Sequence, residues 1–192
     1  MNRMTVKLTT TLLIIMVLCA AGSAEAFIRD KIALKKGHDA YARQDYPAAL
    51  AGYHRAAGFG NAEARFYLSA MYLEGKGTAK DEATAVMWMQ KAAYQGYAPA
   101  QFSMGLNYLR GTGVSENPGQ AYALFQKAAQ SEDEDAQYFL AFLSAIGHGT
   151  SKNEEEALRW FRLAKSNGFP VSDDLLTPEG VAELGKNKWV GS

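Results

Sequence analysis

Cysteine is almost missing from this chain of 192 residues, which contains a single one, Cys19. No disulfide can form within the chain, so its stability must come from packing. An excess of charge of one sign is also lacking, because 20 lysine and arginine residues balance 20 aspartate and glutamate residues. A neutral chain gives no electrostatic argument for binding nucleic acid or an anionic membrane.

Patterns of catalytic and metal-binding residues are equally scarce. The three histidines, His38, His54 and His148, have no second histidine or carboxylate at metal-ligand spacing, and His148 occupies the variable position of a glycine turn. The chain contains no S-x-x-K, G-x-S-x-G or H-E-x-x-H motif and no phosphate-binding P-loop. We therefore predict a protein that is not an enzyme and that holds no metal and no cofactor.

An acidic run over residues 132–135 is the one stretch that suggests calcium. It lacks the alternating oxygen ligands and the glycine of an EF-hand loop. It also precedes a predicted helix, whose dipole favours negative charge at its start. We interpret the run as a solvated helix start.

Long apolar runs are limited to the N-terminus, where residues 1–26 have the features of an export signal. Arg3 and Lys7 precede an apolar run over residues 12–21, and the small residues Ala24 and Ala26 come just before a cleavage point at Phe27. An uncleaved membrane anchor is the alternative, although ten apolar residues are few beside the ~20 that a spanning helix needs.

The residue before Cys19 is Leu18 rather than a small residue, which argues against lipidation at this cysteine. Cleavage after Ala26 leaves 18 basic and 19 acidic residues, so the mature chain is close to neutral. We expect an exported protein without stable membrane insertion after signal cleavage. The periplasm is the favoured location, and secretion is the alternative.

The rest of the chain repeats itself with a period of 36 residues. Alanines and paired glycines mark the period in three successive units: Ala64, Gly75 and Gly77, then Ala100, Gly111 and Gly113, then Ala136, Gly147 and Gly149. A fixed period of this length is typical of a solenoid. We predict an all-α, right-handed α-solenoid of antiparallel helix pairs, in which stacking of the units supplies the core.

Each unit also carries start and stop signals for its helices. Asp81, Asn117 and Asn153 lie 36 residues apart at predicted N-cap positions of the second helices. The G-x-G pairs lie in the turn between the two helices, where a tight connection needs positive φ. A glycine follows the second helix in the first and third units, whereas the middle unit has Glu132 there.

The chain flanking the three units is assigned by the same signals. Residues 27–61 read as a shorter helical hairpin with Asp45 as an N-cap, and the later units insert four residues between their helices. Residues 170–192 contain a helix start at Thr177-Pro178-Glu179 and read as a terminal cap, on which we expect Trp189 to pack. The predicted division is 1–26, signal peptide; 27–61, hairpin; 62–97, 98–133 and 134–169, repeats; 170–192, cap.

These units resemble Sel1-like repeats, relatives of the tetratricopeptide repeat with the pattern A-x-x-x-L-G-x-x-Y-x-x-G-x-G-V followed by K-A-x-x-W-Y-x-K-A-A-x-x-G. The middle unit matches at Ala100, Gly105, Tyr108, Gly111, Gly113, Val114, Asn117, Ala121, Lys127, Ala128 and Ala129. The third unit departs at Ser144 and Leu163, and residues 27–61 resemble a plain tetratricopeptide hairpin.

The resemblance implies a scaffold or adaptor, of a kind often exported in bacteria and tied to envelope signalling or host contact. Cysteine-rich relatives have been associated with β-lactam binding, but the lack of S-x-x-K and of cysteines leaves nothing to carry that property over.

In tetratricopeptide-type solenoids, one side of the first helices lines a concave groove. The residues that the sequence places there are Leu34, His38, Tyr41, Phe66, Leu73, Phe102, Leu106, Leu109, Tyr138 and Phe142. Three interpretations remain open. These side chains pack against adjacent units, they are covered by the C-terminal segment or by a second copy, or they form a groove for a partner protein or peptide.

The leading functional hypothesis is an envelope adaptor that binds a protein or peptide segment through this face. A secreted factor that contacts a host protein is the alternative. A cell-wall enzyme is a third class, and the sequence supplies none of the constellations that it requires.

Overall fold

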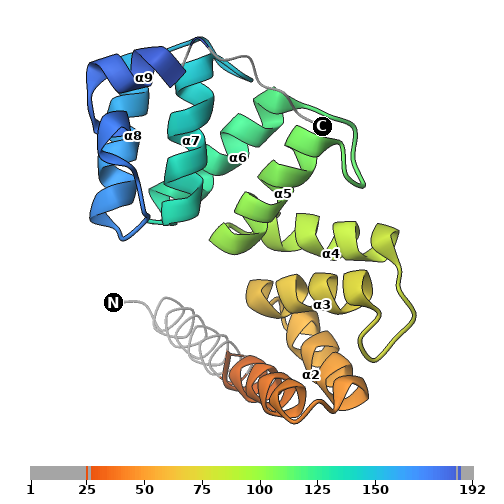
Figure 1. Ribbon diagram of the computed structural model, residues 1–192. Coiled ribbons are helices and arrows are strands. Elements are labelled where there is room, and N and C mark those ends of the chain that lie inside the picture. Colours follow the sequence, from red (N-terminus) through yellow and green to blue (C-terminus); the bar gives the residue numbers. More distant parts are fainter. Residues whose placement is uncertain (1–24, 26, 185, 187–192) are drawn as a thin grey trace, which may run out of the picture.

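The computed structural model describes residues 25, 27–184 and 186, a part of the chain that folds into helices with no strand (Figure 1). The proposed signal sequence, apart from residue 25, and Trp189 lie outside these residues. Within them, no helix is both long enough and apolar enough to cross a membrane.

A helix over residues 27–42 is followed by seven helices of 13 residues each. They are α2 (Tyr46–Gly58), α3 (Ala62–Glu74), α4 (Glu82–Tyr94), α5 (Ala98–Arg110), α6 (Pro118–Gln130), α7 (Glu134–Ile146) and α8 (Glu154–Ser166). A short 3-10 helix, η1 (Asp173–Leu176), and α9 (Pro178–Leu184) complete the described chain.

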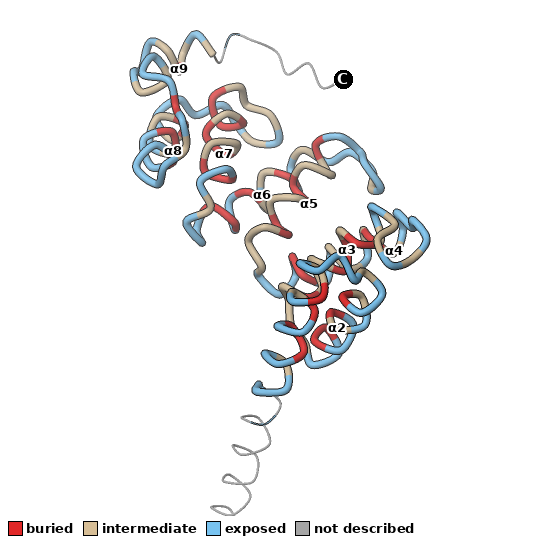
Figure 2. The backbone as a smooth tube through the Cα atoms, turned by 60° about the horizontal axis from the view of Figure 1, so that its bottom comes forward, coloured by how far each residue is buried: buried red, intermediate tan, exposed pale blue. Residues whose placement is uncertain are grey.

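Consecutive helices pack as hairpins, α3 with α4, α5 with α6 and α7 with α8, and the second helix of each hairpin packs on the first helix of the next. The hairpins follow one another along an arc (Figure 1). Buried residues run through the middle of this array, while exposed residues occupy its loops and outer sides (Figure 2). The prediction of an all-α solenoid built of antiparallel helix pairs is confirmed.

Side-chain caps begin the second helices as the sequence predicts. The side-chain oxygens of Asp81, Asn117 and Asn153 each accept a hydrogen bond from the backbone N–H three residues later, at 3.0 Å. Asp45 caps α2 in the same way at 3.2 Å. The acidic run is also confirmed as a helix start, because Asp133 caps α7 and accepts a hydrogen bond from the N–H of Ala136 at 2.8 Å.

Each G-x-G turn ends a first helix and then rests on the unit before it. The first glycines cap α3, α5 and α7 with φ between 67° and 72°. The second glycines also have positive φ, and a Cβ atom at Gly149 would lie 2.2 Å from the carbonyl oxygen of Pro118, the first residue of α6. Only a residue without a side chain permits this backbone contact.

Small residues let the two helices of a pair approach closely. Ala64, Ala100 and Ala136 are fully buried at the same position of α3, α5 and α7. At Gly105 an added Cβ would lie 2.7 Å from the Phe125 ring, so the ring packs directly on the α5 backbone. Burying such a ring supplies a large share of apolar contact.

In each of the three units, the second helix is followed by a residue in the left-handed backbone region. Gly96 and Gly168 have φ of 88° and 108°, and Glu132 takes φ 63° at the matching place in the middle unit. The missing glycine therefore changes the residue but not the path of the chain. The backbone strain falls on Glu132, because a residue with a Cβ atom disfavours this region.

The C-terminal helix covers the last repeat. Val181 of α9 is fully buried together with Phe161 of α8, and Leu175, Leu176 and Leu184 pack against the same cluster. The helix starts as the sequence predicts, with the Thr177 hydroxyl accepting a hydrogen bond from the N–H of Gly180 at 3.1 Å.

Candidate protein-binding face

The predicted face divides into buried, half-buried and exposed residues. Leu34 and Leu109 are buried, with 6% and 3% of their surface exposed, so they belong to the core. Leu73 is 44% exposed. The remaining residues are half-buried: His38, Tyr41, Phe66, Phe102, Leu106, Tyr138 and Phe142. Contact of this face with a partner therefore remains a prediction that rests on the half-buried and exposed members.

Aromatic contacts join three of these side chains to the following part of the chain. The Phe66 ring lies 5.5 Å from Tyr97, the last residue of the same repeat, and the Phe102 ring lies 5.4 Å from Phe139 in the next repeat. Tyr138 stacks on Phe169 with ring centroids 4.4 Å apart. Such pairs stabilise packing by about 0.5–1.5 kcal/mol beyond the area they bury.

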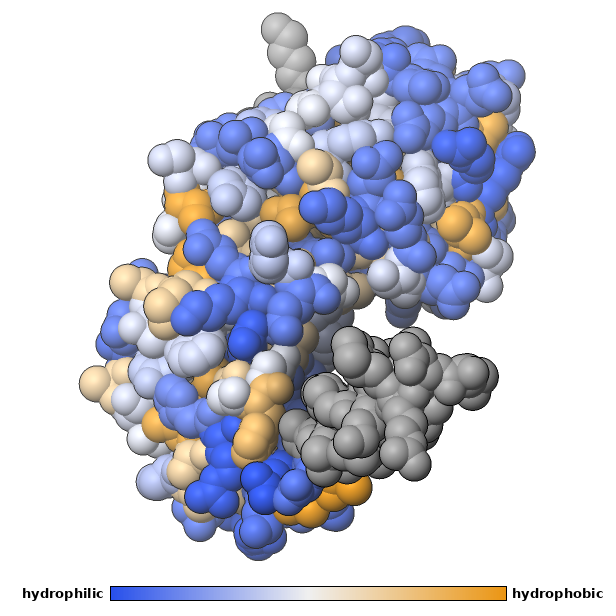
Figure 3. All heavy atoms as spheres, turned by 180° about the vertical axis from the view of Figure 1, so that it is seen from behind, coloured by the Kyte–Doolittle hydropathy of each residue, from blue (hydrophilic) through white to orange (hydrophobic). Residues whose placement is uncertain are grey.

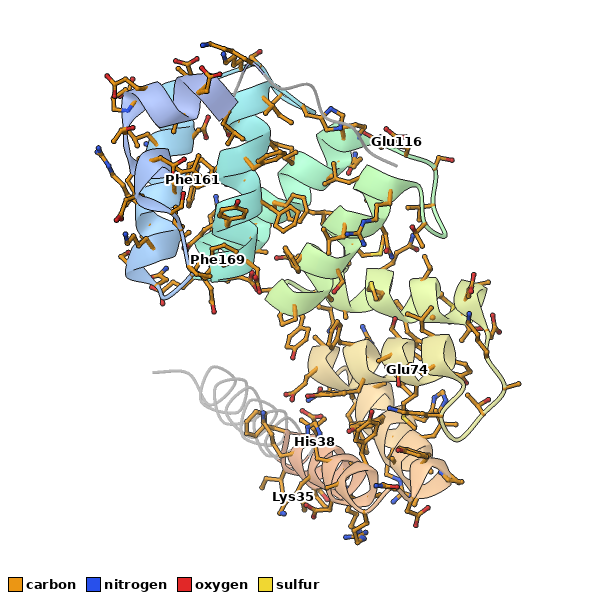
Figure 4. The ribbon with its side chains drawn as sticks, viewed as in Figure 1. Lys35, His38, Glu74, Glu116, Phe161 and Phe169 are labelled. Carbon is orange, nitrogen blue, oxygen red and sulfur yellow. The ribbon has the colours of Figure 1, made fainter. Side chains whose placement is uncertain are left out.

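Figure 4 shows Phe161 and Phe169 beside α7, where both rings contact Tyr138. Of these contacts, only that of Phe102 with Phe139 crosses from one repeat to the next, so the three interpretations of the face stay open. Its half-buried rings still leave surface for a further contact.

Polar contacts fix the N-terminal end of the face. His38 shares a hydrogen bond of 3.1 Å between its Nδ1 and the Tyr53 hydroxyl, and its Nε2 lies 3.2 Å from a carboxylate oxygen of Glu63. Burial raises the pKa of Tyr53 well above its usual range, and the nearby Tyr67, Tyr41 and Glu63 add to the shift. The Tyr53 phenol therefore stays neutral.

Tyr41 is tied to the first G-x-G turn. Its hydroxyl accepts a hydrogen bond of 2.8 Å from Lys76 Nζ, which also pairs with Glu74 at 2.6 Å. These two partners, Glu74 first, raise the pKa of Lys76, so its positive charge is retained. The variable position of this turn therefore joins the leading hairpin to the first repeat.

The third unit departs from the repeat pattern at Ser144, and the structure shows what replaces the usual tyrosine. Ser144 is fully buried, and its hydroxyl lies 3.3 Å from the Tyr122 hydroxyl of the preceding unit. Tyr122 also donates to Glu156 at 3.2 Å. A tyrosine from α6 thus lies where α7 has a small residue.

Several exposed apolar side chains lie outside the predicted face, among them two of α4. Met87 and Tyr94 of α4 are 40% and 95% exposed. A comparison of repeats gives a signal for Tyr94, because the matching positions hold the polar residues Gln130 and Ser166. A large aromatic at a position that is polar in both sister repeats marks a feature that the repeat packing does not require.

The described residues also bear on whether this surface could hold a metal ion. Among residues 25, 27–184 and 186, no group of three histidine, cysteine, aspartate or glutamate side chains lies close enough together to hold a metal ion. The half-buried aromatics and aliphatics offer apolar area, and the side chains around them offer hydrogen bonds.

Comparison with known proteins agrees with this architecture. The family model described as Sel1 repeat matches residues 62–97, 98–133 and 134–169. No protein with a curated description matches the chain significantly.

Two solved structures are similar to the described fold. A Sel1 repeat protein from Oxalobacter formigenes is 34% identical with a TM-score of 0.67, over 73% of this chain and 56% of that one. A protective antigen of uropathogenic Escherichia coli strains, which displays an SLR fold, is 35% identical with a TM-score of 0.59, over 66% of this chain and 26% of the antigen.

The chain thus spans about half the length of the first of these proteins and about a quarter of the second. Proteins built from these repeats are helical scaffolds that typically mediate protein–protein interactions and are generally not enzymes. With three consecutive repeats over more than half of its length, this chain belongs to the Sel1 repeat family.

Proposed function

We propose that this protein is an exported adaptor of the bacterial envelope, which binds a segment of another protein through the first-helix face of its repeats. The observation that carries the proposal is the row of half-buried aromatics Phe66, Phe102 and Tyr138, which recurs every 36 residues along the array. Apolar anchors at a regular spacing suit a helical or extended peptide laid along a groove.

The charge pattern and the surface support a protein partner over a nucleic acid or a lipid bilayer. The chain has no net charge, and the view in Figure 3 shows apolar residues as separate small patches among hydrophilic ones. Scattered patches of this kind suit a partner that contributes polar as well as apolar contacts. This protein acts without a metal, a cofactor or a chemical step of its own.

Export supplies the second part of the proposal. The positive start, the apolar run and the small residues before Phe27 support a cleaved signal peptide and a periplasmic location. Full-length protein produced in bacteria should appear in the periplasmic fraction, with a mature N-terminus at Phe27 by mass spectrometry. Retention of the intact N-terminus in the membrane fraction would contradict this part.

Contact with a host protein is the second candidate. The observation that favours it is the 35% identity to a protein described as a protective antigen of uropathogenic strains. Recovery of the mature protein from the culture medium rather than from the periplasm would favour this candidate.

Partner binding is tested with a pair of matched charge variants. Leu73 lies on the proposed face and is 44% exposed, whereas Leu163 of α8 lies off it and is 40% exposed. We expect Leu73→Glu to abolish cross-linked capture of a partner from envelope extract, while Leu163→Glu captures it as the unmodified protein does.

Helical circular dichroism and thermal unfolding must show that both variants remain folded. Equal capture by all three proteins would place the binding surface elsewhere. Leu106→Glu is a less decisive variant, because Leu106 packs against the buried cluster around Phe125 and its substitution also weakens the fold.

A further inference from the structure

The middle repeat buries a hydrogen-bond acceptor that has no donor. Gln101 of α5 is 5% exposed, and its Nε2 donates to the carbonyl oxygen of Ala93 at 3.2 Å. Its other amide atom, Oε1, is buried and makes no hydrogen bond. An unpaired buried acceptor is unfavourable, and the great majority of such atoms in folded proteins find a partner.

The third repeat satisfies the same position. Gln137, 36 residues later, makes the same bond to the carbonyl oxygen of Ala129 at 3.2 Å. Its Oε1 accepts a hydrogen bond from Asn167 Nδ2 at 3.0 Å. Asn167 is the residue that follows α8, so the end of the second helix supplies the donor.

The first repeat has a different pair here, and the Nε atom of its Arg65 is also buried without a partner. Arg65 stands at the matching position and donates to Gln95 Oε1 at 2.7 Å, and Gln95 is the residue that follows α4. In the middle repeat the residue that follows α6 is Ser131, whose side chain is much shorter. The middle repeat therefore lacks the donor because Ser131 stands where the third repeat has Asn167.

Gln101 also lines a hollow between α4, α5 and α6. Its volume is about 380 Å³, and its other lining residues are Gln90, Ala93, Tyr94, Met104, Tyr108, Gln120, Leu124 and Lys127. A volume at the small end of the range for ligand sites suits one or two side chains rather than a large cofactor. Met104 and Tyr108 lie on the side of α5 opposite Phe102 and Leu106, so this hollow is distinct from the proposed first-helix face.

The rim of the hollow adds apolar surface and positive charge. Tyr94, the most exposed of the large hydrophobic side chains in the described part of the chain, lines both this hollow and a second one over α3 and α4, which also includes Met87 and Lys91. Within the described chain, neither Lys127 nor Lys91 forms a salt bridge with an acidic side chain, and Lys91 lies over the Trp88 ring.

We propose that this hollow binds a tyrosine side chain of a partner peptide, with an acidic residue beside it in the peptide. The tyrosine hydroxyl donates to Gln101 Oε1, its ring packs between Met104 and Tyr94, and the carboxylate pairs with Lys127. Gln101 Oε1 and Met104 are covered in the structure, so binding requires the exposed rim side chains Gln90 and Lys127 to move aside. The site replaces the donor that Asn167 supplies to Gln137 in the third repeat.

The probes are two blocked peptides, acetyl-Gly-Tyr-Asp-Gly-amide and the same peptide with phenylalanine in place of tyrosine. Binding to the full chain is followed by two-dimensional NMR, with the side-chain amide of Gln101 as the reporter. We expect the tyrosine peptide to shift this resonance and to bind about tenfold more tightly than the phenylalanine peptide, the ratio that corresponds to one hydrogen bond of about 1.4 kcal/mol.

Two variants at one residue separate the hydrogen bond from the rest of the site. Ser131→Asn supplies an internal donor in the manner of Asn167, and we expect it to reduce the tyrosine-over-phenylalanine preference to about twofold or less. Ser131→Ala changes the same position without supplying a donor and should keep the preference.

An unchanged preference in Ser131→Asn, or a Gln101 resonance that the tyrosine peptide does not move, would overturn the proposal. Shifts in this region that depend on protein concentration alone would identify a second copy of the chain as the occupant instead. Failure of the Leu73→Glu experiment leaves these outcomes unaffected, because the two surfaces lie on opposite sides of α5.

Discussion

The second glycine of each G-x-G turn offers a graded test of how the repeats are joined. Gly149 combines positive φ with backbone in its way, since an added Cβ would lie 2.2 Å from the Pro118 oxygen and 2.4 Å from the Pro118 carbonyl carbon. Gly168 also has positive φ, at 108°, but an added Cβ would meet nothing within 4 Å. The two positions therefore separate backbone strain from a clash between units.

Alanine at Gly168 should cost only the conformational term, about 1 kcal/mol of unfolding free energy. Alanine at Gly149 adds overpacking against backbone, which cannot rotate away, and we expect a total loss of at least about 3 kcal/mol. Gly113 should fall between them, because its added Cβ would meet the Val86 side chain at 2.6 Å rather than backbone.

Urea unfolding followed by circular dichroism measures these free energies. The slope of the unfolding free energy against urea concentration checks that each variant exposes the same amount of surface when it unfolds. Equal losses for Gly149→Ala and Gly168→Ala would refute the reasoning. That result would mean that the turn relaxes freely and that its contact with α6 contributes nothing to stability.

Two further substitutions test the described interior. Burial raises the pKa of Asp133, and the charges of Asp135 and Glu134 add to the shift. Above its raised pKa in the folded protein, the ionised Asp133 therefore destabilises the fold. This destabilisation disappears as the pH falls through that pKa. Asp133→Asn should therefore raise the thermal unfolding midpoint at neutral pH, and this gain should vanish below pH ~4. A gain in the midpoint that does not depend on pH would contradict this explanation. Ser69 is fully buried with an unpaired hydroxyl, so Ser69→Ala should raise the unfolding free energy by about 1 kcal/mol. Ser103→Ala, which removes a hydroxyl bonded to the Pro99 carbonyl oxygen at 2.8 Å, should show no such gain in the same urea titration.

The sequence predicts the helices well because their signals are local. Asn117 and Asn153 cap the helices that the 36-residue period assigns to them, and Gly111 and Gly147 take the left-handed conformation at the ends of α5 and α7. A cap or a turn depends on residues within four positions of one another, which a single sequence shows directly.

The surface is harder to predict because each first helix contacts more than one neighbour. An amphipathic pattern divides a helix into one buried and one exposed side. In the array, α5 packs on its partner α6 and on α4 of the unit before, so its buried arc is wider. Leu109 is therefore buried, although the pattern along the helix assigns it to an open face, and Gln101 of the same helix is buried as well.

Long side chains add a second limit. The contact between Gln137 and Asn167 spans 30 residues, and the reach of the two side chains decides whether it forms. In the sequence, Ser131 and Asn167 are simply two small polar residues at the same position of successive repeats. Only the three-dimensional arrangement shows that the first leaves Gln101 without a donor.

The contact of the second glycines with the preceding unit also bears on the curvature of the array. At Gly77 and Gly149 the chain touches main-chain atoms of Tyr46 and Pro118, whereas at Gly113 it touches the side chain of Val86. A contact between main-chain atoms stays the same when the side chain of the contacted residue, Tyr46 or Pro118, is exchanged. Of these three contacts, the one between the first and second repeats is therefore the one that a single substitution, at Val86, can change.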